Sequence, residues 1–255
     1  MISILYEDKE MIVVKKPAGQ ESQASRGFAP DLVSEIRNHL AGSQDIHKLA
    51  TKKSPGCSQS QPPYVGVIHR LDKPVSGIMV YAKSQKAAAA LSKALQQGDM
   101  KKEYCAVVCG KPVDNQGTYV DYLCQDRKTN TSRIVDKSVE NSKRAELSYK
   151  VRETLVHQEE EGEKEFSLVE IQLVTGRHHQ IRVQFSGHGT PLYGDGRYGK
   201  NGQQKSRRSL ALCACRLEFP HPVTGKKMKF EITPQGGAFD WFTSLRPSHG
   251  SPTHP

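Results

Sequence analysis

A single carboxylate, Asp72, lies in the stretch whose residue types are best suited to chemistry. From position 69 to 77 the stretch reads His-Arg-Leu-Asp-Lys-Pro-Val-Ser-Gly. Pro74 favours extended geometry in the residue before it, and the β-branched and aromatic run from Val75 to Ala82 predicts a buried strand. Asp72 is therefore expected on a stiff loop that enters a strand, where reactive groups concentrate. The alternative is an Asp that only pairs with Arg70 or caps a turn.

A tyrosine and a turn are the next candidates along the chain. Lys101-Lys102-Glu103-Tyr104 begins a predicted strand, and Tyr104 could stack on a base or transfer a proton, although a core tyrosine is the alternative. The stretch Leu-Val-Thr-Gly-Arg-His-His-Gln-Ile-Arg, 173–182, predicts a strand end, a tight turn and a helix start. Backbone N–H groups at a helix start favour anions such as phosphate.

The remaining pattern contains many strands and few helices. Helices are predicted over 31–40, 84–97, 179–187 and 239–245, and strands over 2–6, 11–15, 75–82, 102–109, 117–124, 143–155, 166–174, 209–219 and 227–232. Such a pattern favours an α+β domain on a mixed, mainly antiparallel sheet. We expect one catalytic domain over 1–245, with a mobile loop at 41–63 and a disordered tail at 246–255.

The charge of the chain points to a polyanionic partner. Lys and Arg number 37 against 27 Asp and Glu, which gives a net charge of +10, and residues 197–208 are basic without an acidic side chain. A merely soluble basic protein is the alternative. No apolar run approaches the ~20 residues that a membrane span needs. The six cysteines include no C-x-x-C pair, so buried thiols in a reducing cytoplasm are expected.

These stretches together resemble the signatures of the RluA-type pseudouridine synthases. In that family the first signature is H-R-L-D followed by a basic residue and then S-G, the second is K-x-Y, and the third is T-G-R-x-H-Q-I-R. Further blocks of the family pattern correspond to 191–199 and 210–222. Pro74-Val75 departs from the pattern, as does Cys213, where the family commonly has His. Many relatives carry an S4 domain first; here the catalytic pattern begins at once, so none is expected.

The resemblance implies a fold, a reaction and a set of site residues. It implies an α+β domain with a basic cleft, which isomerises uridine in RNA without a cofactor or metal. Asp72 would be the catalytic residue, as nucleophile or as base at the ribose, with Tyr104 beside it and Arg182 in a salt bridge to it. The residues expected to bind RNA are His69, Arg70, Lys102, Arg177, His179, Gln180, Arg207, Arg208 and Leu212, with Arg70 as a wedge and Leu212 as a wall for the uracil.

The partner implied is ribosomal or transfer RNA, as a structured stem-loop or a single-stranded segment, and a cytoplasmic monomer is expected. Two other functions stay open. One is an RNA-binding protein without activity. The other is a metal-dependent hydrolase that would use His178, His179, His188 and Asp195, although adjacent histidines in a helix do not easily share one ion.

Overall fold

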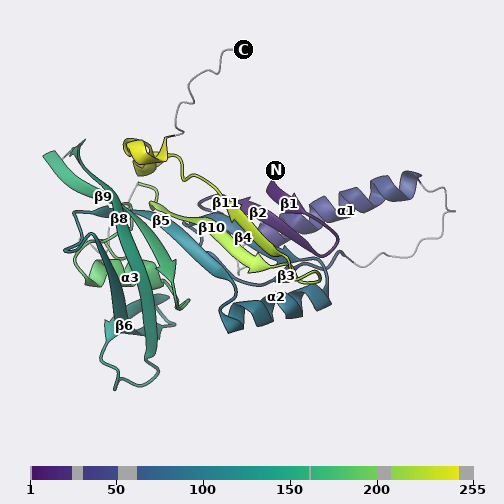
Figure 1. Cartoon of the computed structure of the whole chain (residues 1–255), viewed down its shortest axis with the longest axis horizontal. Coiled ribbons are helices and arrows are strands. Elements are labelled where there is room, and N and C mark those ends of the chain that lie inside the picture. Colours follow the sequence, from purple (N-terminus) through teal and green to yellow (C-terminus); the bar gives the residue numbers. More distant parts are fainter. Residues whose placement is uncertain (1, 25–30, 51–61, 161, 200–207, 247–255) are drawn as a thin grey trace, which may run out of the picture. The chain divides into compact units, whose positions relative to one another are not determined.

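The computed structural model describes residues 2–24, 31–50, 62–160, 162–199 and 208–246, with only the backbone over 43–50. The chain divides into two compact units (Figure 1). The first, here called the N-terminal unit, comprises residues 1–102 and 214–232; the second, called the central unit, comprises 103–213 and 233–255. Each is described by itself.

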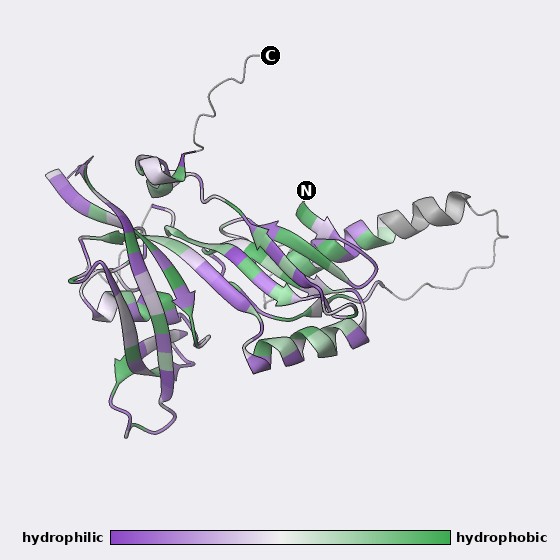
Figure 2. Cartoon of the chain, viewed as in Figure 1, coloured by the Kyte–Doolittle hydropathy of each residue, from purple (hydrophilic) through white to green (hydrophobic). Residues whose placement is uncertain are grey.

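The N-terminal unit contains three mostly buried strands, Met11–Lys16, Ser76–Ala82 and Leu212–Pro220, and two mostly exposed ones, Ser3–Glu7 and Lys227–Glu231. β1 (Ser3–Glu7), β2 (Met11–Lys16) and β4 (Ser76–Ala82) pair antiparallel in that order, and β3 (Gly66–Val67) pairs with β4. β10 (Leu212–Pro220) pairs antiparallel with β11 (Lys227–Glu231). Figure 2 shows long hydrophobic stretches on β2 and β4. Such continuous apolar runs are typical of strands covered on both sides.

Two helices accompany these strands. α2 (Gln85–Gln97) begins where Ser84 accepts a hydrogen bond from the N–H of Ala87, and it ends at Gly98, which has a φ of 81°. Its Leu91 joins a core cluster with side chains from β2, β4 and β10. α1 (Leu32–Ala50) is linked to β1 by His39 and Glu7, 2.7 Å apart.

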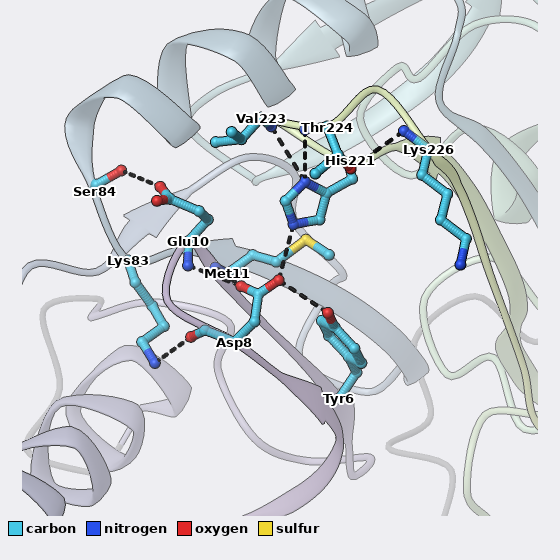
Figure 3. Close-up of polar contacts among 10 residues, drawn as sticks. All are labelled: Tyr6, Asp8, Glu10, Met11, Lys83, Ser84, His221, Val223, Thr224 and Lys226. Carbon is cyan, nitrogen blue, oxygen red and sulfur yellow. Dashed lines mark hydrogen bonds and ion pairs between the residues drawn. The ribbon is translucent and has the colours of Figure 1, made fainter.

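A clasp of side chains joins two turns of the N-terminal unit (Figure 3). Asp8 accepts hydrogen bonds from the N–H groups of Glu10 and Met11, both at 2.8 Å, which caps the turn between β1 and β2. His221, in the turn between β10 and β11, lies with its Nε2 2.8 Å from the other carboxylate oxygen of Asp8. The Nδ1 of His221 accepts from two backbone N–H groups, so Nε2 carries the proton and donates to Asp8.

The described part of the central unit is an antiparallel sheet with one short α-helix. Its strand order is β5 (Lys101–Cys109), β9 (Gly162–Leu173), β8 (Lys143–Glu159), β6 (Gln116–Asp126) and β7 (Thr131–Val135). α3 (Gln180–Gly187) packs Val183 against Leu123 and Ala145 on one face. Two 3-10 turns, η1 (Gly237–Trp241) and η2 (Thr243–Leu245), follow β11 in the chain.

The α+β class with a mainly antiparallel sheet is confirmed, and three details of the prediction are wrong. The expected loop at 41–63 is helical as far as Ala50, because polar residues without proline do not prevent a helix; residues 51–61 lie outside the described residues. Two short strands, β3 and β7, are not among the predicted ones. The expected C-terminal helix is two 3-10 turns, with Phe242 extended between them. Beyond Arg246 the tail is outside the description. Among the described residues no helix is long and apolar enough to cross a membrane.

Candidate active site

The loop that carries Asp72 closes on itself immediately before β4. The N–H of Val75 donates to the carbonyl of Asp72 at 2.9 Å. Asp72 is half-buried, and Arg70 is exposed. Gly77 follows with a φ of 135°, and a Cβ there would lie 2.5 Å from the backbone nitrogen of Ala214. The glycine of the motif is therefore needed both for its backbone conformation and for this close approach.

The chain after β2 holds this loop from the side. Lys16 is fully buried, and its ammonium group donates to the carbonyls of Pro17 at 3.0 Å, Gln20 at 2.7 Å and Lys73 at 3.1 Å. The N–H of Gly19 also donates to Lys73, at 2.8 Å. The residue that follows Asp72 is thus fixed through its carbonyl by two donors.

The residue that precedes Asp72 is fixed as well. The hydroxyl of Ser22 donates to the carbonyl of Leu71 at 2.7 Å and accepts from its N–H at 3.1 Å. Sequence reasoning missed both Lys16 and Ser22. The signal available for Lys16 was the opening Val-Val-Lys-Lys-Pro-Ala-Gly, which ends a strand with a basic residue.

Three basic side chains of the N-terminal unit have perturbed pKa values. Burial lowers the pKa of Lys16 to about 8, and the charges of Glu21 and Asp72 oppose this shift. Burial, together with the charge of Lys102, lowers the pKa of His69 to about 3, and burial also lowers the pKa of Lys102. His69 is therefore neutral at pH 7. It is only 8% exposed, and its Nε2 accepts a hydrogen bond from the N–H of Val80 at 3.3 Å. This hydrogen bond joins the loop that carries Asp72 to β4.

Tyr104 lies inside β5 of the central unit. It is 6% exposed and pairs across the strands with Ile171 of β9. In an antiparallel pair, directly opposed residues project to the same face of the sheet, and Ile171 also opposes Tyr149 of β8. The tyrosine is thus held in a row of buried side chains on one face.

The turn that leads into α3 is held by side-chain amide and hydroxyl groups. The Oε1 of Gln180 accepts from the hydroxyl of Thr175 at 2.8 Å and from the N–H of Arg177 at 2.9 Å. Its Nε2 donates to the carbonyl of Glu146 at 3.0 Å. Gln180 is 3% exposed, so the structure uses this predicted RNA-binding residue to close the turn. Arg177 is exposed, and its Nε donates to the carbonyl of Arg144 at 2.8 Å.

The half-buried His179 and the buried Arg182 both contact Tyr198 and so belong to one cluster. His179 has a φ of 54°, and its Nδ1 lies 2.7 Å from the hydroxyl of Tyr198. Burial, with the charge of Arg182 next, lowers its pKa to about 3. The guanidinium of Arg182 contacts both carboxylate oxygens of Asp195, at 2.7 and 2.8 Å. Burial alone would raise the pKa of Asp195, but the hydrogen bonds and charge of Arg182 outweigh it and lower this pKa.

Asp195 was considered only as a metal ligand from the sequence, and its pairing with Arg182 was missed. The signal was present in the block Pro-Leu-Tyr-Gly-Asp, whose acidic residue follows a turn. Arg182 and Asp72 belong to different units, so their expected salt bridge stays a prediction. Among the described residues no group of three His, Cys, Asp or Glu side chains is arranged to hold a metal ion.

The remaining predicted residues lie near the end of the segment 103–213 of the central unit. Arg208 is exposed, forms an ion pair with Glu159, and lies 5.5 Å from the centre of the Tyr193 ring. Leu212 is 4% exposed at the start of β10. Arg207 lies outside the described residues. Arg197, from the same basic stretch, donates to the carbonyls of Thr129 and Asn130.

Comparison with known proteins gives one consistent answer. Residues 10–187 match the family model described as RNA pseudouridylate synthase. The ribosomal large subunit pseudouridine synthase D of Zymomonas mobilis is 32% identical over 240 residues, which cover 90% of this chain and 68% of that protein. An uncharacterized RNA pseudouridine synthase of Bacillus subtilis, YlyB, is 32% identical over 237 residues, with the same shares.

The structure of human RNA pseudouridylate synthase domain containing 1 superimposes with a TM-score of 0.72, at 21% identity, over 96% of this chain and 86% of that one. This likeness concerns the fold. The matched segment contains all three signatures quoted above, and the predicted reaction class, isomerisation of uridine in RNA, is confirmed by the family match. The chain therefore belongs to the RluA-type RNA pseudouridylate synthase family.

Proposed function

We propose that this enzyme converts a specific uridine of ribosomal or transfer RNA to pseudouridine with Asp72 as the catalytic residue. The observation that carries the proposal is the fixation of the backbone on both sides of Asp72, by Ser22 at Leu71 and by Lys16 and Gly19 at Lys73. A catalytic group must be held close to its productive geometry. The names of relatives that act on the ribosomal large subunit make ribosomal RNA the first substrate to test.

In the proposed reaction the C1′–N1 bond of uridine breaks, the uracil rotates, and a C5–C1′ bond forms. The proton on C5 is lost, and N1 gains a proton. Asp72 acts as nucleophile at carbon or as base at the ribose, and both roles require its ionised form. The buried ammonium of Lys16 interacts with the Asp72 charge, and a nearby cation favours the carboxylate.

Tyr104 and Arg182 complete the proposed catalytic set. The ring of Tyr104 stacks on the uracil, and its hydroxyl assists in removal of the C5 proton. Arg182 holds Asp72 by a salt bridge. A guanidinium has five N–H donors on three nitrogens, and Asp195 uses Nε and Nη2.

RNA binding is proposed to be mainly electrostatic. The proposed enzyme is a cytoplasmic monomer, and its residues 1–245 act as one catalytic domain. The exposed Arg70, Arg177 and Arg208 suit contacts with phosphates or, for Arg70, the space left by a flipped nucleotide. The other predicted RNA-binding residues with described side chains are half-buried or buried, namely Lys102, His179, His69, Gln180 and Leu212. Their proposed role is to shape the surface that binds RNA.

The test is release of tritium from RNA labelled at uridine C5. Transcripts of ribosomal large-subunit RNA and a pool of unmodified transfer RNA are incubated with the purified protein, with and without EDTA, and pseudouridine is then located by chemical mapping. We expect release from one of these RNAs at a defined position, with or without the chelator. Binding without any release would favour the RNA-binding protein that lacks activity, and release abolished by EDTA would favour metal-dependent chemistry.

A further inference from the structure

One buried hydroxyl satisfies both backbone groups of the residue before Asp72. Ser22 is 3% exposed, and its Oγ donates to the carbonyl of Leu71 at 2.7 Å while it accepts from the Leu71 N–H at 3.1 Å. Leu71 belongs to no strand or helix, so no ladder supplies partners for its backbone. At this point of the loop the side chain of Ser22 supplies the hydrogen-bond partners that a neighbouring strand would supply in a sheet.

Ser22 is itself held by a rigid strand. The hydroxyl of Tyr81, which is fully buried in β4, donates to the carbonyl of Ser22 at 2.8 Å. Burial raises the pKa of Tyr81, so its hydroxyl remains a neutral donor at any pH of interest. The Sδ of Met79 lies 3.5 Å from both hydroxyls and packs beside them. The hydrogen bonds therefore run from β4 through Ser22 to Leu71.

We propose that Ser22, oriented by Tyr81, is a positioning residue that sets where the carboxylate of Asp72 stands. The inference rests on the proposed function of Asp72. Removal of the hydroxyl leaves the Leu71 N–H and C=O without their Ser22 partner in a buried place, and the loop gains freedom next to the reacting group. A shift of about 1 Å in a catalytic group can lower turnover about a hundredfold.

Loss of the Ser22 hydroxyl should affect turnover and RNA binding differently. Ser22 contacts the backbone behind Asp72, so its loss should act on kcat and leave the affinity for RNA unchanged. For Ser22→Ala we expect faster hydrogen exchange at the Leu71 amide, a kcat lowered about tenfold or more, and a Kd for RNA within twofold of wild type. Tyr81→Phe, which keeps the ring and removes only the donor to Ser22, should raise the exchange rate at Leu71 and lower kcat by smaller factors, again with a Kd for RNA within twofold of wild type.

Ser167→Ala is the matched control. Ser167 is also fully buried, and its Oγ lies 3.0 Å from the hydroxyl of Thr154 in the β8–β9 hairpin. This variant loses one buried hydroxyl of the central unit, whose partner is Thr154 and not the backbone beside Asp72, so its kcat should equal that of wild type at a temperature where all variants are folded. Equal loss of kcat in Ser167→Ala would show a general effect of destabilisation and overturn the proposal.

The following results would overturn the inference or move the decision to another variant. Wild-type kcat in Ser22→Ala, or unchanged exchange at Leu71, would overturn it while the proposed function stands. A weakened Kd with unchanged kcat would make Ser22 part of RNA binding and overturn it too. If Ser22→Ala does not fold, the same readings on Tyr81→Phe decide. If the wild-type protein releases no tritium from any RNA, the proposed function fails first and the inference falls with it.

Discussion

Two motif regions of the molecule are held in place by different physical means. Around Asp72 in the N-terminal unit, hydrogen bonds from Lys16, Gly19 and Ser22 reach the backbone on either side of the acidic residue. In α3 of the central unit, the pairing of Arg182 with Asp195 joins two buried charged side chains. The first arrangement fixes the position of a loop, whereas the second fixes a charge. The two should therefore respond differently to mutation, pH and salt.

The largest effect on stability is expected at Asp195. Asp195→Asn keeps the shape of the side chain but leaves the charge of Arg182, 7% exposed, without this carboxylate. Removal of one partner of a buried ion pair costs about 3–5 kcal/mol. Urea unfolding measures the loss. The control, Arg152→Ala, breaks an ion pair with Glu170 that is about half exposed and should cost at most about 1 kcal/mol. Equal losses of unfolding free energy in Asp195→Asn and Arg152→Ala would contradict the claim that the buried ion pair contributes more to stability than the exposed one.

The second effect is a pH dependence at Lys16. Its pKa is about 8 in the folded protein and 10.5 when unperturbed, so between these values the unfolded state binds more protons. The contribution of Lys16 to the free energy of unfolding should therefore rise with pH in this window, by at most about 1.4 kcal/mol per unit. Urea unfolding of wild type and Lys16→Met from pH 7 to 10.5 measures the difference. A difference that stays flat across the window would refute the lowered pKa.

The clasp of Asp8 and His221 should give a smaller effect, because it is only partly buried. Burial alone would raise the pKa of Asp8, but hydrogen bonds from His221, from two backbone N–H groups and from Tyr6 lower it. Its contribution to stability is thus present above pH 4 and is lost as the pH falls through the folded-state pKa. Asp8→Asn should cost about 1–2 kcal/mol at pH 7, and less in acid. Asp136→Asn, at an exposed turn, is the control.

The smallest effect is expected at Arg208, which is already paired with Glu159. If Arg208 contacts a phosphate, Arg208→Ala should lower the slope of log K against log salt by about 0.7 on single-stranded RNA. Filter binding at several salt concentrations measures this slope, with Lys227→Ala in the N-terminal unit as control. An unchanged slope would remove Arg208 from the RNA-binding residues.

The sequence was sufficient for most of the elements and for the motif loop but not for the contacts that hold the loop. Pro74 and the apolar run after it predict a stiff loop before a strand, as found. Ser22 lies among polar residues without a period, and its contact with Leu71 spans 49 positions, so no local pattern could reveal it. The signature around Gln180 predicts a functional turn, but residue types alone do not tell whether a polar side chain meets RNA or closes the turn. β7 is short and mixed in polarity, which explains why it was missed.

The most direct test of the account is the activity of Asp72→Asn. The amide is nearly isosteric, and the contacts described on either side of it go to the backbone of Leu71 and Lys73, so folding and RNA affinity should equal those of wild type. The neutral amide can neither attack carbon as a carboxylate nor accept a proton, so tritium release from C5-labelled uridine RNA should vanish. A folded Asp72→Asn protein that binds RNA and releases tritium at the wild-type rate would contradict the central claim.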